Sequence, residues 1–345
     1  MSWARVARRG PRWLGVVVGL GVAAYGCAEA AEGTPDAAPV LPILTHTKTV
    51  QLDRAQIWSA LSYDGGSILL TTMFDQRIVL KTLDLDLTET RPAVPLTTPS
   101  DLADDHIADH AHVLVDGVLY VAFSNARADA MYAFRADRDG QRLGGLVPVQ
   151  TPAGVRTNDM HLFASGAGVH VLYGSAGTER TLKTYDTDLR LVSEVALHLS
   201  IRLGQLGSTL AHDGGYLMFT GDETQHDLVV SRWDSDWTEA TPFWQTLVAS
   251  GGPDWNYFAS GAVFDPANGR WYIAYSHFFP ANGSDTDAVA LAAFDASFQR
   301  IERQEVTGLR HFRPHLLLVG EVLVLAYDRP GAVFVSTYRV AQGAR

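Results

Sequence analysis

Three short stretches of the sequence place histidines beside carboxylates or arginines. They read DDHIADHAH at 104–112, RTNDMH at 156–161 and RHFRPH at 310–315. A neutral imidazole offers a lone pair to Zn²⁺ or Mn²⁺, and a neighbouring carboxylate adds negative charge to such a site. An imidazole can also take a proton from a substrate as a general base. Such histidines can equally be structural, bonding one another, backbone carbonyls and trapped water. The sequence leaves the three interpretations open.

Four residues of these stretches are the candidates for catalysis. His112, His161 and His315 are the candidate bases, and Asp159 lies close to His161 in the sequence. The same three histidines are the candidate ligands for a divalent transition metal in the channel, and the sequence otherwise leaves the cofactor unknown. No short-range motif such as His-Glu-x-x-His accompanies them, so their role depends on whether the fold brings them together.

Other polar and aromatic residues in neighbouring segments are candidates for ligand binding. They are Arg156, Arg313, Trp255, Tyr257, His277 and Asp328. The two arginines could each hold a carboxylate or sulfate through two parallel hydrogen bonds. The Trp and Tyr could stack on the C–H face of a sugar ring. Each of these residues could instead pair with a neighbour or pack between structural elements.

The elements that must position these residues form an internal repeat. Six apolar, strand-like segments each follow a turn rich in Gly, Asp or Asn, and their starts are separated by 51, 51, 47, 55 and 51 residues. They are SILLTTM at 67–73, VLYVAFS at 118–124, VHVLYGS at 169–175, YLMFTGD at 216–222, WYIAYSH at 271–277 and VLVLAYD at 322–328. A weaker strand precedes each one and a third strand follows it. Repeats of about this length are typical of β-propeller blades.

The sixth repeat lacks a fourth strand, and a replacement lies before the first repeat. The segment THTKTVQL at 45–52 has no other partner. We therefore predict an all-β fold, a six-bladed β-propeller over residues 43–345 that is closed by its N-terminal strand. Alignment of the repeats on their first turn places six residues in register on the strands expected to line the central channel. These are Ala60, His112, His161, Thr209, Ser260 and His315.

An Asp-x-Asp pair follows the third strand in each of the first four repeats. The four sequences are LDLD at 83–86, ADRD at 136–139, YDTD at 185–188 and WDSD at 233–236. Short polar side chains that bond their own backbone suit tight turns. The further oxygen ligands of a Ca²⁺-binding loop do not follow, so we expect turns here and not calcium sites.

These repeats resemble the irregular propeller repeats of extracellular bacterial carbohydrate-active proteins. They lack the Ser-x-Asp-x-Gly-x-x-Trp box of sialidases, and they lack the Gly-His and Trp-Asp dipeptides of WD40 repeats at their proper places. The resemblance therefore identifies no particular enzyme family. The histidines in register on the channel strands lead us to expect a His-rich channel face that binds a glycan or another envelope component. The alternatives are a polysaccharide lyase or glycoside hydrolase that uses channel histidines, and a protein–protein scaffold.

The N-terminal residues carry the pattern of a secretion signal. Four arginines precede the apolar stretch at 13–24, which is too short and too rich in Gly for a membrane span. The sequence AYGC at 24–27 follows and resembles the lipobox of bacterial lipoproteins. The resemblance implies a signal peptide over 1–26, lipidation of Cys27 and a flexible tether over 27–42.

A lipid-anchored protein of this kind would lie in the bacterial cell envelope, in the periplasm or at the outer surface, and would contact the membrane through its anchor only. An ordinary secretory signal, cut after Ala28 or Ala30, is the alternative.

Composition and charge narrow the function classes further. The chain has 345 residues, of which 47% are hydrophobic and 19% charged, a globular composition. Its single Cys excludes a disulfide framework. The net charge of −11 would become −15 after removal of residues 1–26, which hold four arginines and no acidic residue. A chain with so much negative charge is repelled by the phosphates of nucleic acid, so we do not expect it to bind nucleic acid. We also expect the protein to be a monomer.

Overall fold

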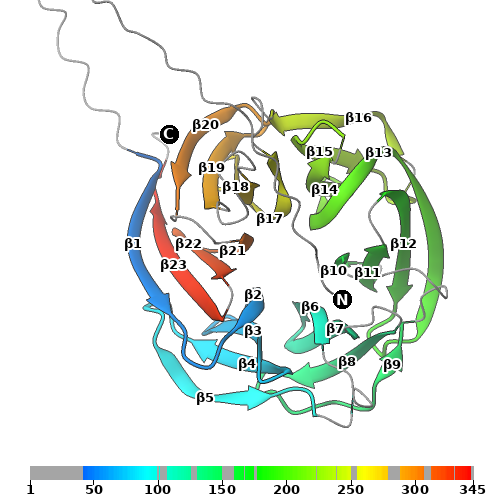
Figure 1. The fold of residues 1–345 in the computed structure, drawn as a ribbon, viewed down its shortest axis with the longest axis vertical. Coiled ribbons are helices and arrows are strands. Elements are labelled where there is room, and N and C mark those ends of the chain that lie inside the picture. Colours follow the sequence, from blue (N-terminus) through cyan, green and yellow to red (C-terminus); the bar gives the residue numbers. More distant parts are fainter. Residues whose placement is uncertain are drawn as a thin grey trace, which may run out of the picture. The chain divides into compact units, whose positions relative to one another are not determined.

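The computed structural model describes most of the chain from residue 42 onward. The described residues are 42–98, 101, 107–125, 130–149, 159–166, 168–174, 177–222, 224–237, 239–249, 255–278, 288–306, 312–329 and 331–342. Their strands are arranged as blades around a central axis (Figure 1). The described residues include no helix that is long and apolar enough to cross a membrane.

Three blades are separate four-stranded sheets whose antiparallel strands pair in chain order. Blade 1 consists of β2 (Ile57–Tyr63), β3 (Ile68–Phe74), β4 (Arg77–Leu83) and β5 (Glu89–Pro95). Blade 2 consists of β6 (Ile107–Val115), β7 (Val118–Asn125), β8 (Met131–Asp137) and β9 (Val147–Pro148). Blade 5 consists of β17 (Trp255–Asp265), β18 (Arg270–Phe278), β19 (Ala288–Asp295) and β20 (Arg300–Glu305).

Blades 3 and 4 are joined into one seven-stranded sheet. Its strands are β10 (Asp159–Ser165), β11 (Gly168–Gly174), β12 (Gly177–Tyr185), β13 (Leu191–His212), β14 (Gly215–Asp222), β15 (Leu228–Trp233) and β16 (Glu239–Val248). The strand β13 is the outer strand of blade 3 and then the inner strand of blade 4. It pairs with β12 through Glu194 opposite Lys183, and with β14 through Leu210 opposite Leu217. The chain thus passes between these two blades without leaving the sheet.

The sixth blade is completed by the N-terminal strand, as predicted. It consists of β21 (Phe312–Val319), β22 (Val322–Arg329), β23 (Ala332–Val340) and β1 (Leu44–Gln51), and β1 pairs antiparallel with β23. Side chains strengthen the pairing, because Thr49 Oγ1 and Ser336 Oγ lie 2.8 Å apart, as do Thr47 Oγ1 and Thr337 Oγ1. Figure 1 shows β1 along the outer edge of this blade. The ring is therefore closed by hydrogen bonds between the two ends of the described chain.

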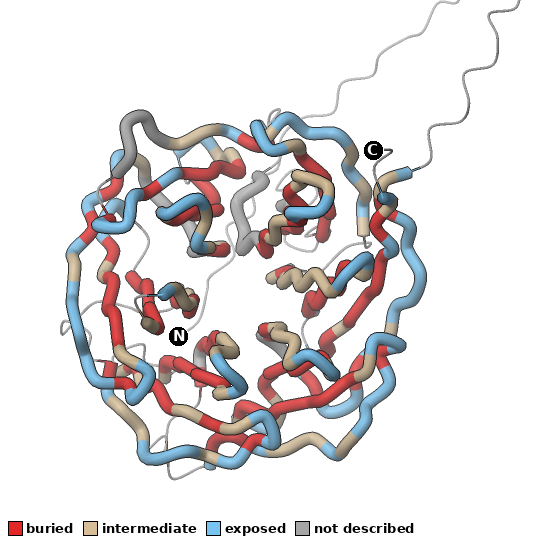
Figure 2. Tube along the Cα trace, turned by 180° about the vertical axis from the view of Figure 1, so that it is seen from behind, coloured by how far each residue is buried: buried red, intermediate tan, exposed pale blue. Residues whose placement is uncertain are grey.

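The second strand of each blade lies deepest in the fold. Six of the seven residues of β3 are buried, and β22 is buried from Leu323 to Asp328. Strands that are covered on both faces read as continuous apolar runs, which is the pattern that marks the six repeats in the sequence. Figure 2 shows buried residues along the middle strands and exposed residues along the outer rim.

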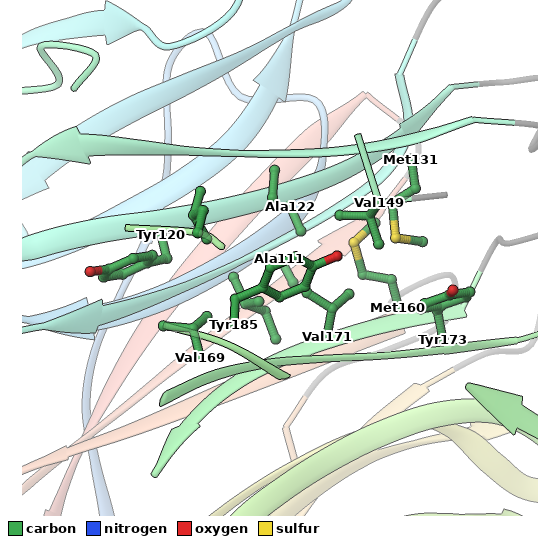
Figure 3. Packing of buried hydrophobic residues seen from close by; sticks show 13 residues of the cluster. Ala111, Tyr120, Ala122, Met131, Val149, Met160, Val169, Val171, Tyr173 and Tyr185 are labelled. Atoms are coloured by element: carbon green, nitrogen blue, oxygen red, sulfur yellow. The ribbon is translucent and has the colours of Figure 1, made fainter. Parts of the chain in front are cut away.

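Apolar side chains fill the space between neighbouring blades. Between blades 2 and 3, Tyr120 and Ala122 of β7 belong to one cluster with Val171 of β11 and Tyr185 of β12 (Figure 3). Further clusters of this kind join the other blades around the ring. The core of the protein is therefore distributed over the blade junctions, and each blade depends on both neighbours for its burial.

The recurring Asp-x-Asp pairs form tight turns, as predicted. In the third repeat, Asp186 Oδ1 accepts hydrogen bonds from the backbone N–H groups of Asp188 at 2.8 Å and Arg190 at 2.9 Å. Asp137 and Asp295 bond their own turns in the same way. The first Asp therefore fixes the turn between the third and fourth strands.

The residue two positions later reaches the preceding blade. A side chain of that blade bonds it in four repeats: Lys48 Nζ donates to the Asp86 carbonyl at 2.5 Å, Arg91 pairs with Asp139, Arg135 Nη1 donates to Asp188 Oδ1 at 2.7 Å, and Gln245 Nε2 donates to the Ser297 carbonyl at 3.3 Å. These contacts are exposed, so each contributes only about 0.2–1 kcal/mol. In the second and third repeats the acceptor is the second carboxylate of the pair, whereas in the first and fifth it is the backbone carbonyl, which any residue supplies.

Close approach of two inner strands makes Gly261 a critical position. A Cβ atom at Gly261 on β17 would lie 2.9 Å from the Cα of His315 and 2.7 Å from the backbone nitrogen of Leu316 on β21. We predict that Gly261→Ala destabilises the protein by about 1–3 kcal/mol, because backbone atoms cannot move aside as a flexible side chain can. Thermal or urea unfolding measures the change. Gly145→Ala is the control, since no heavy atom lies within 4 Å of its added Cβ. Equal stability of the two variants would contradict the tight junction.

Candidate functional site

The inner strands enclose a cavity at the centre of the ring. Its volume is about 360 Å³, and five of the six residues predicted in register line it. These are Ala60 on β2, His112 on β6, His161 on β10, Thr209 on β13 and His315 on β21. At the sixth position, on β17, the cavity is lined by Gly261, next to the predicted Ser260. The cavity therefore lies where the alignment of the repeats expects the channel.

His112 connects blade 2 to blade 1 through both of its ring nitrogens. Its Nδ1 lies 2.6 Å from Thr71 Oγ1, and its Nε2 lies 2.8 Å from Ser62 Oγ. The same Thr71 hydroxyl lies 3.1 Å from Nε2 of His110, whose Nδ1 is buried with no hydrogen-bond partner in the structure. A hydroxyl both donates and accepts, so the four groups form a continuous chain. Both nitrogens of His112 are thereby used to hold two blades together.

His161 connects blade 3 to blade 4. The backbone N–H of Thr209 donates a hydrogen bond of 2.9 Å to His161 Nδ1. An amide can only donate here, so Nδ1 carries the lone pair and the ring proton sits on Nε2. His161 is therefore a neutral imidazole whose Nε2–H is its remaining donor at the cavity. The ring also stacks on Phe163, with 5.7 Å between the ring centres.

His315 is the histidine of the cavity that has no hydrogen bond to the described part of the protein. It lies on β21 opposite Ala326 of β22, half-buried, where β17 approaches most closely. Both of its ring nitrogens remain available to a ligand.

Burial keeps all the channel histidines neutral. It lowers the pKa of His110, His112 and His161 from the usual value near 6.5 to about 3, and that of His315 to about 4. Protonated His315 would repel a positive charge on each of the other three, which lowers their pKa values further. The positive charge of Arg313 acts on His315 in the same direction. These four histidines therefore carry no positive charge at neutral pH.

The three-histidine metal site allowed by the sequence is not formed by the described side chains. No group of three His, Cys, Asp or Glu side chains among them is arranged to hold a metal ion. The hydrogen bonds give the reason. His112 uses both nitrogens to join blades, and His161 offers the cavity a proton in place of a lone pair. Among the described residues that line the cavity, His315 alone offers a nitrogen lone pair, and one ligand is too few for a site.

Arg313 and Asp328, two of the predicted ligand-binding residues, bind each other. Arg313 Nη1 donates to Asp328 Oδ2 at 3.2 Å, and Asp328 is completely buried. The backbone N–H of Arg313 also donates to Ser276 Oγ of blade 5 at 3.2 Å. Arg313 has a φ of +53°, a conformation that costs energy for a residue other than Gly. This pair lies beside His315 along β21 but is not among the residues that line the cavity.

The remaining predicted site residues are placed only by their backbone. Asp159 begins β10 opposite Gly174, and Trp255 begins β17 opposite Phe278. Tyr257 follows on β17, and His277 lies near the end of β18 opposite Ala288. The side chains of these four residues lie outside the described part of the structure, and so does Arg156 entirely. Their proposed roles as a base or as ligand contacts stay predictions.

The structure adds polar residues that the repeat alignment did not single out. Ser62 and Thr71 hold His112, and Ser208 Oγ accepts the backbone N–H of Ala262 across the junction of blades 4 and 5 at 3.2 Å. In the sequence, residues of this kind can be found as hydroxyl side chains within an otherwise apolar strand, as in ILLTTMF of β3. Such a residue needs a partner when it is buried.

Comparisons with known proteins concern the fold. No protein-family model matches the sequence, and no curated protein matches it either. A solved member of the DUF4221 family from Bacteroides vulgatus has a TM-score of 0.54 and 10% identity over 87% of this chain and 98% of that chain. An exo-beta-1,3-galactanase from Phanerochaete chrysosporium has a TM-score of 0.51 and 11% identity, over 83% and 79%.

A third similar structure is a calcium-binding protein, regucalcin, from Agrobacterium tumefaciens. Its TM-score is 0.51, with 14% identity over 86% of this chain and 95% of that chain. The likenesses support the β-propeller architecture. Because the similar proteins have different functions at such low identity, the function of this chain has to be argued from its own residues.

The depressed pKa values predict a loss of stability in acid. Each histidine is neutral in the folded protein down to about pH 3 or 4 and takes up a proton near pH 6.5 when unfolded. The unfolded chain therefore binds more protons in this interval, so stability decreases as the pH falls from about 6.5 towards about 3. Unfolding midpoints measured at several pH values check this.

In the same measurement, His161→Asn should show a shallower decrease, because one of the titrating groups is gone. His198→Asn is the matched control, since His198 is an exposed histidine on blade 3. Identical pH profiles for His161→Asn and the unmodified protein would contradict the buried, neutral state of His161.

Proposed function

We propose that the protein is a ligand-binding propeller of the bacterial cell envelope whose channel takes a glycan or another envelope component. The observation that carries the proposal is the lining of the cavity. Its described residues supply imidazoles, hydroxyls and apolar side chains, and include no Asp, Glu, Lys or Arg. Sugars offer hydroxyl groups and C–H faces, which groups of this kind bind.

Binding is better supported than catalysis. Glycoside hydrolysis requires two carboxyl groups placed on either side of the scissile bond. The described buried carboxylates are Asp109, Asp222, Asp265 and Asp328, on blades 2, 4, 5 and 6, and none of them is among the residues that line the cavity. A general base works best with a pKa near the working pH, and the pKa values of the channel histidines are about 3 to 4. The polysaccharide lyase and glycoside hydrolase alternatives, like the scaffold alternative, gain no support from the described site.

The envelope part of the proposal rests on the lipobox-like sequence AYGC at 24–27, which lies outside the described residues. A lipid on Cys27 would confine the propeller to a membrane surface. Confinement raises the local concentration of a surface ligand, so that a site of low affinity can still be occupied.

We predict that Cys27→Ala moves the protein out of the membrane fraction of a bacterial host. Incorporation of a labelled fatty acid should be lost with it, because the thiol of Cys27 is the acceptor of the lipid. Fractionation and labelling of the expressed full chain measure both effects. Retention of Cys27→Ala in the membrane with an undiminished label would exclude this anchor. Release of the unmodified protein without any label would favour the ordinary secretory signal.

We predict that His315→Ala weakens glycan binding by at least tenfold, because this ring has its hydrogen-bonding groups available in the cavity. Binding of the purified full chain to an immobilised glycan panel, followed by titration of the best member, measures the change. His198→Ala is the control and should bind as the unmodified protein does. Full affinity of His315→Ala, with an unchanged unfolding midpoint, would place the ligand outside the channel.

A further inference from the structure

We infer that the channel selects a neutral, hydroxyl-rich glycan segment and discriminates against uronates, sulfated sugars and metal ions. This inference rests on the proposed function, because it specifies the chemistry of the same ligand. It is carried by the hydrogen bonds that the channel histidines already make. Those bonds determine which polar atoms are left for a ligand.

The described lining of the cavity offers no cation to a charged ligand. A carboxylate or sulfate that enters the cavity loses hydration and needs a cation in exchange. The described lining residues include no Lys or Arg, and the nearby Arg313 is already bonded to the buried Asp328. The imidazoles stay uncharged at neutral pH because burial favours their neutral form. An anionic ligand would therefore lose solvation without gaining an ionic partner.

The hydrogen bonds within the protein determine which donors and acceptors of the three lining histidines remain for a ligand. His112 contributes none, because Thr71 and Ser62 occupy both of its nitrogens. His161 contributes one donor, Nε2–H, because the Thr209 amide occupies its Nδ1. His315 contributes one donor and one acceptor. A sugar hydroxyl both donates and accepts, so it can satisfy all these groups, whereas a carboxylate only accepts and would leave the nitrogen lone pair of His315 unpaired.

Apolar side chains form part of the cavity wall. Leu162, Phe163, Leu210 and Leu316 line the same cavity as the histidines. A pyranose ring has polar edges and apolar C–H faces, and its faces can lie against such side chains while its hydroxyls reach the imidazoles. The alternation of apolar and neutral polar groups in the cavity therefore matches an uncharged sugar.

The test uses matched oligosaccharides that differ only at C6. Titration calorimetry of the purified full chain compares hexamers of glucose, galactose and mannose with the corresponding hexamers of glucuronate, galacturonate and mannuronate. We expect at least one neutral hexamer to bind, and to bind at least tenfold more tightly than its uronate counterpart. Preference for a uronate would overturn this inference and leave glycan binding in place. Absence of binding by all six, with binding elsewhere on the immobilised glycan panel, would overturn this inference alone, whereas absence of binding on both would also overturn the glycan part of the proposed function.

Two substitutions of His161 separate its structural bond from its ligand contact. In His161→Asn, the side-chain oxygen can still accept the Thr209 N–H, but the Nε2–H donor is removed. In His161→Gln, the amide N–H extends to the position of Nε2. We expect His161→Asn to lower the affinity at least tenfold while the unfolding midpoint stays close to that of the unmodified protein, and His161→Gln to recover part of the affinity.

The controls address the competing roles of the histidine. His198→Asn should leave the affinity unchanged. If His161→Asn binds the neutral hexamer as tightly as the unmodified protein, Nε2–H is not a ligand contact and the inference is wrong. Titration with Zn²⁺ alone gives an independent check. Stoichiometric zinc binding that disappears in His161→Asn would require a lone pair on Nε2 and would also overturn the inference.

Discussion

The dependence of each blade on its two neighbours is the constraint from which the rest of the structure follows. The core consists of apolar clusters between blades, so no blade is buried by its own side chains alone. The ring must close for the first and last blades to gain the same burial, which is the task of β1. At the centre the inner strands come so close that Gly261 has no room for a Cβ. Polar groups buried there have to find partners across a blade junction.

The channel histidines meet this requirement, and in doing so they lose the properties that would make them reactive. His112 and His161 bond to blades 1 and 4, respectively, and the described side chains then hold no set of lone pairs for a metal. The burial that makes the bonds effective also lowers the pKa values to about 3 and keeps the rings neutral. Two of the three predicted histidines thus form bonds between blades, and His315 has no hydrogen bond to the described residues.

The architecture could be predicted from the sequence because its signals are local. Buried second strands are continuous apolar runs, turns contain Gly, Asp or Asn, and the unpaired segment at 45–52 completes the sixth blade. For the candidate site, the sequence predicted only which positions of the inner strands face the channel. Which nitrogen of His161 is engaged depends on Thr209, 48 residues later, and Thr71 lies 41 residues before His112. Contacts between neighbouring repeats leave no local pattern, and the same holds for the continuous strand β13 and for the pairing of Arg313 with Asp328.

The distribution of charge extends the same argument to recognition. The formal net charge is −11, and Asp86, Asp139, Asp188 and Asp236 place exposed acidic groups in the turns between the third and fourth strands. The described lining of the cavity has no charged residue. A neutral ligand is therefore not drawn in by the electrostatic field of the protein, and its recognition depends on the fit of its hydroxyls to fixed donors and acceptors. The Nε2–H donor of His161 is set by a bond between blades, so in the proposed site an interaction that stabilises the ring would also orient a group offered to the ligand.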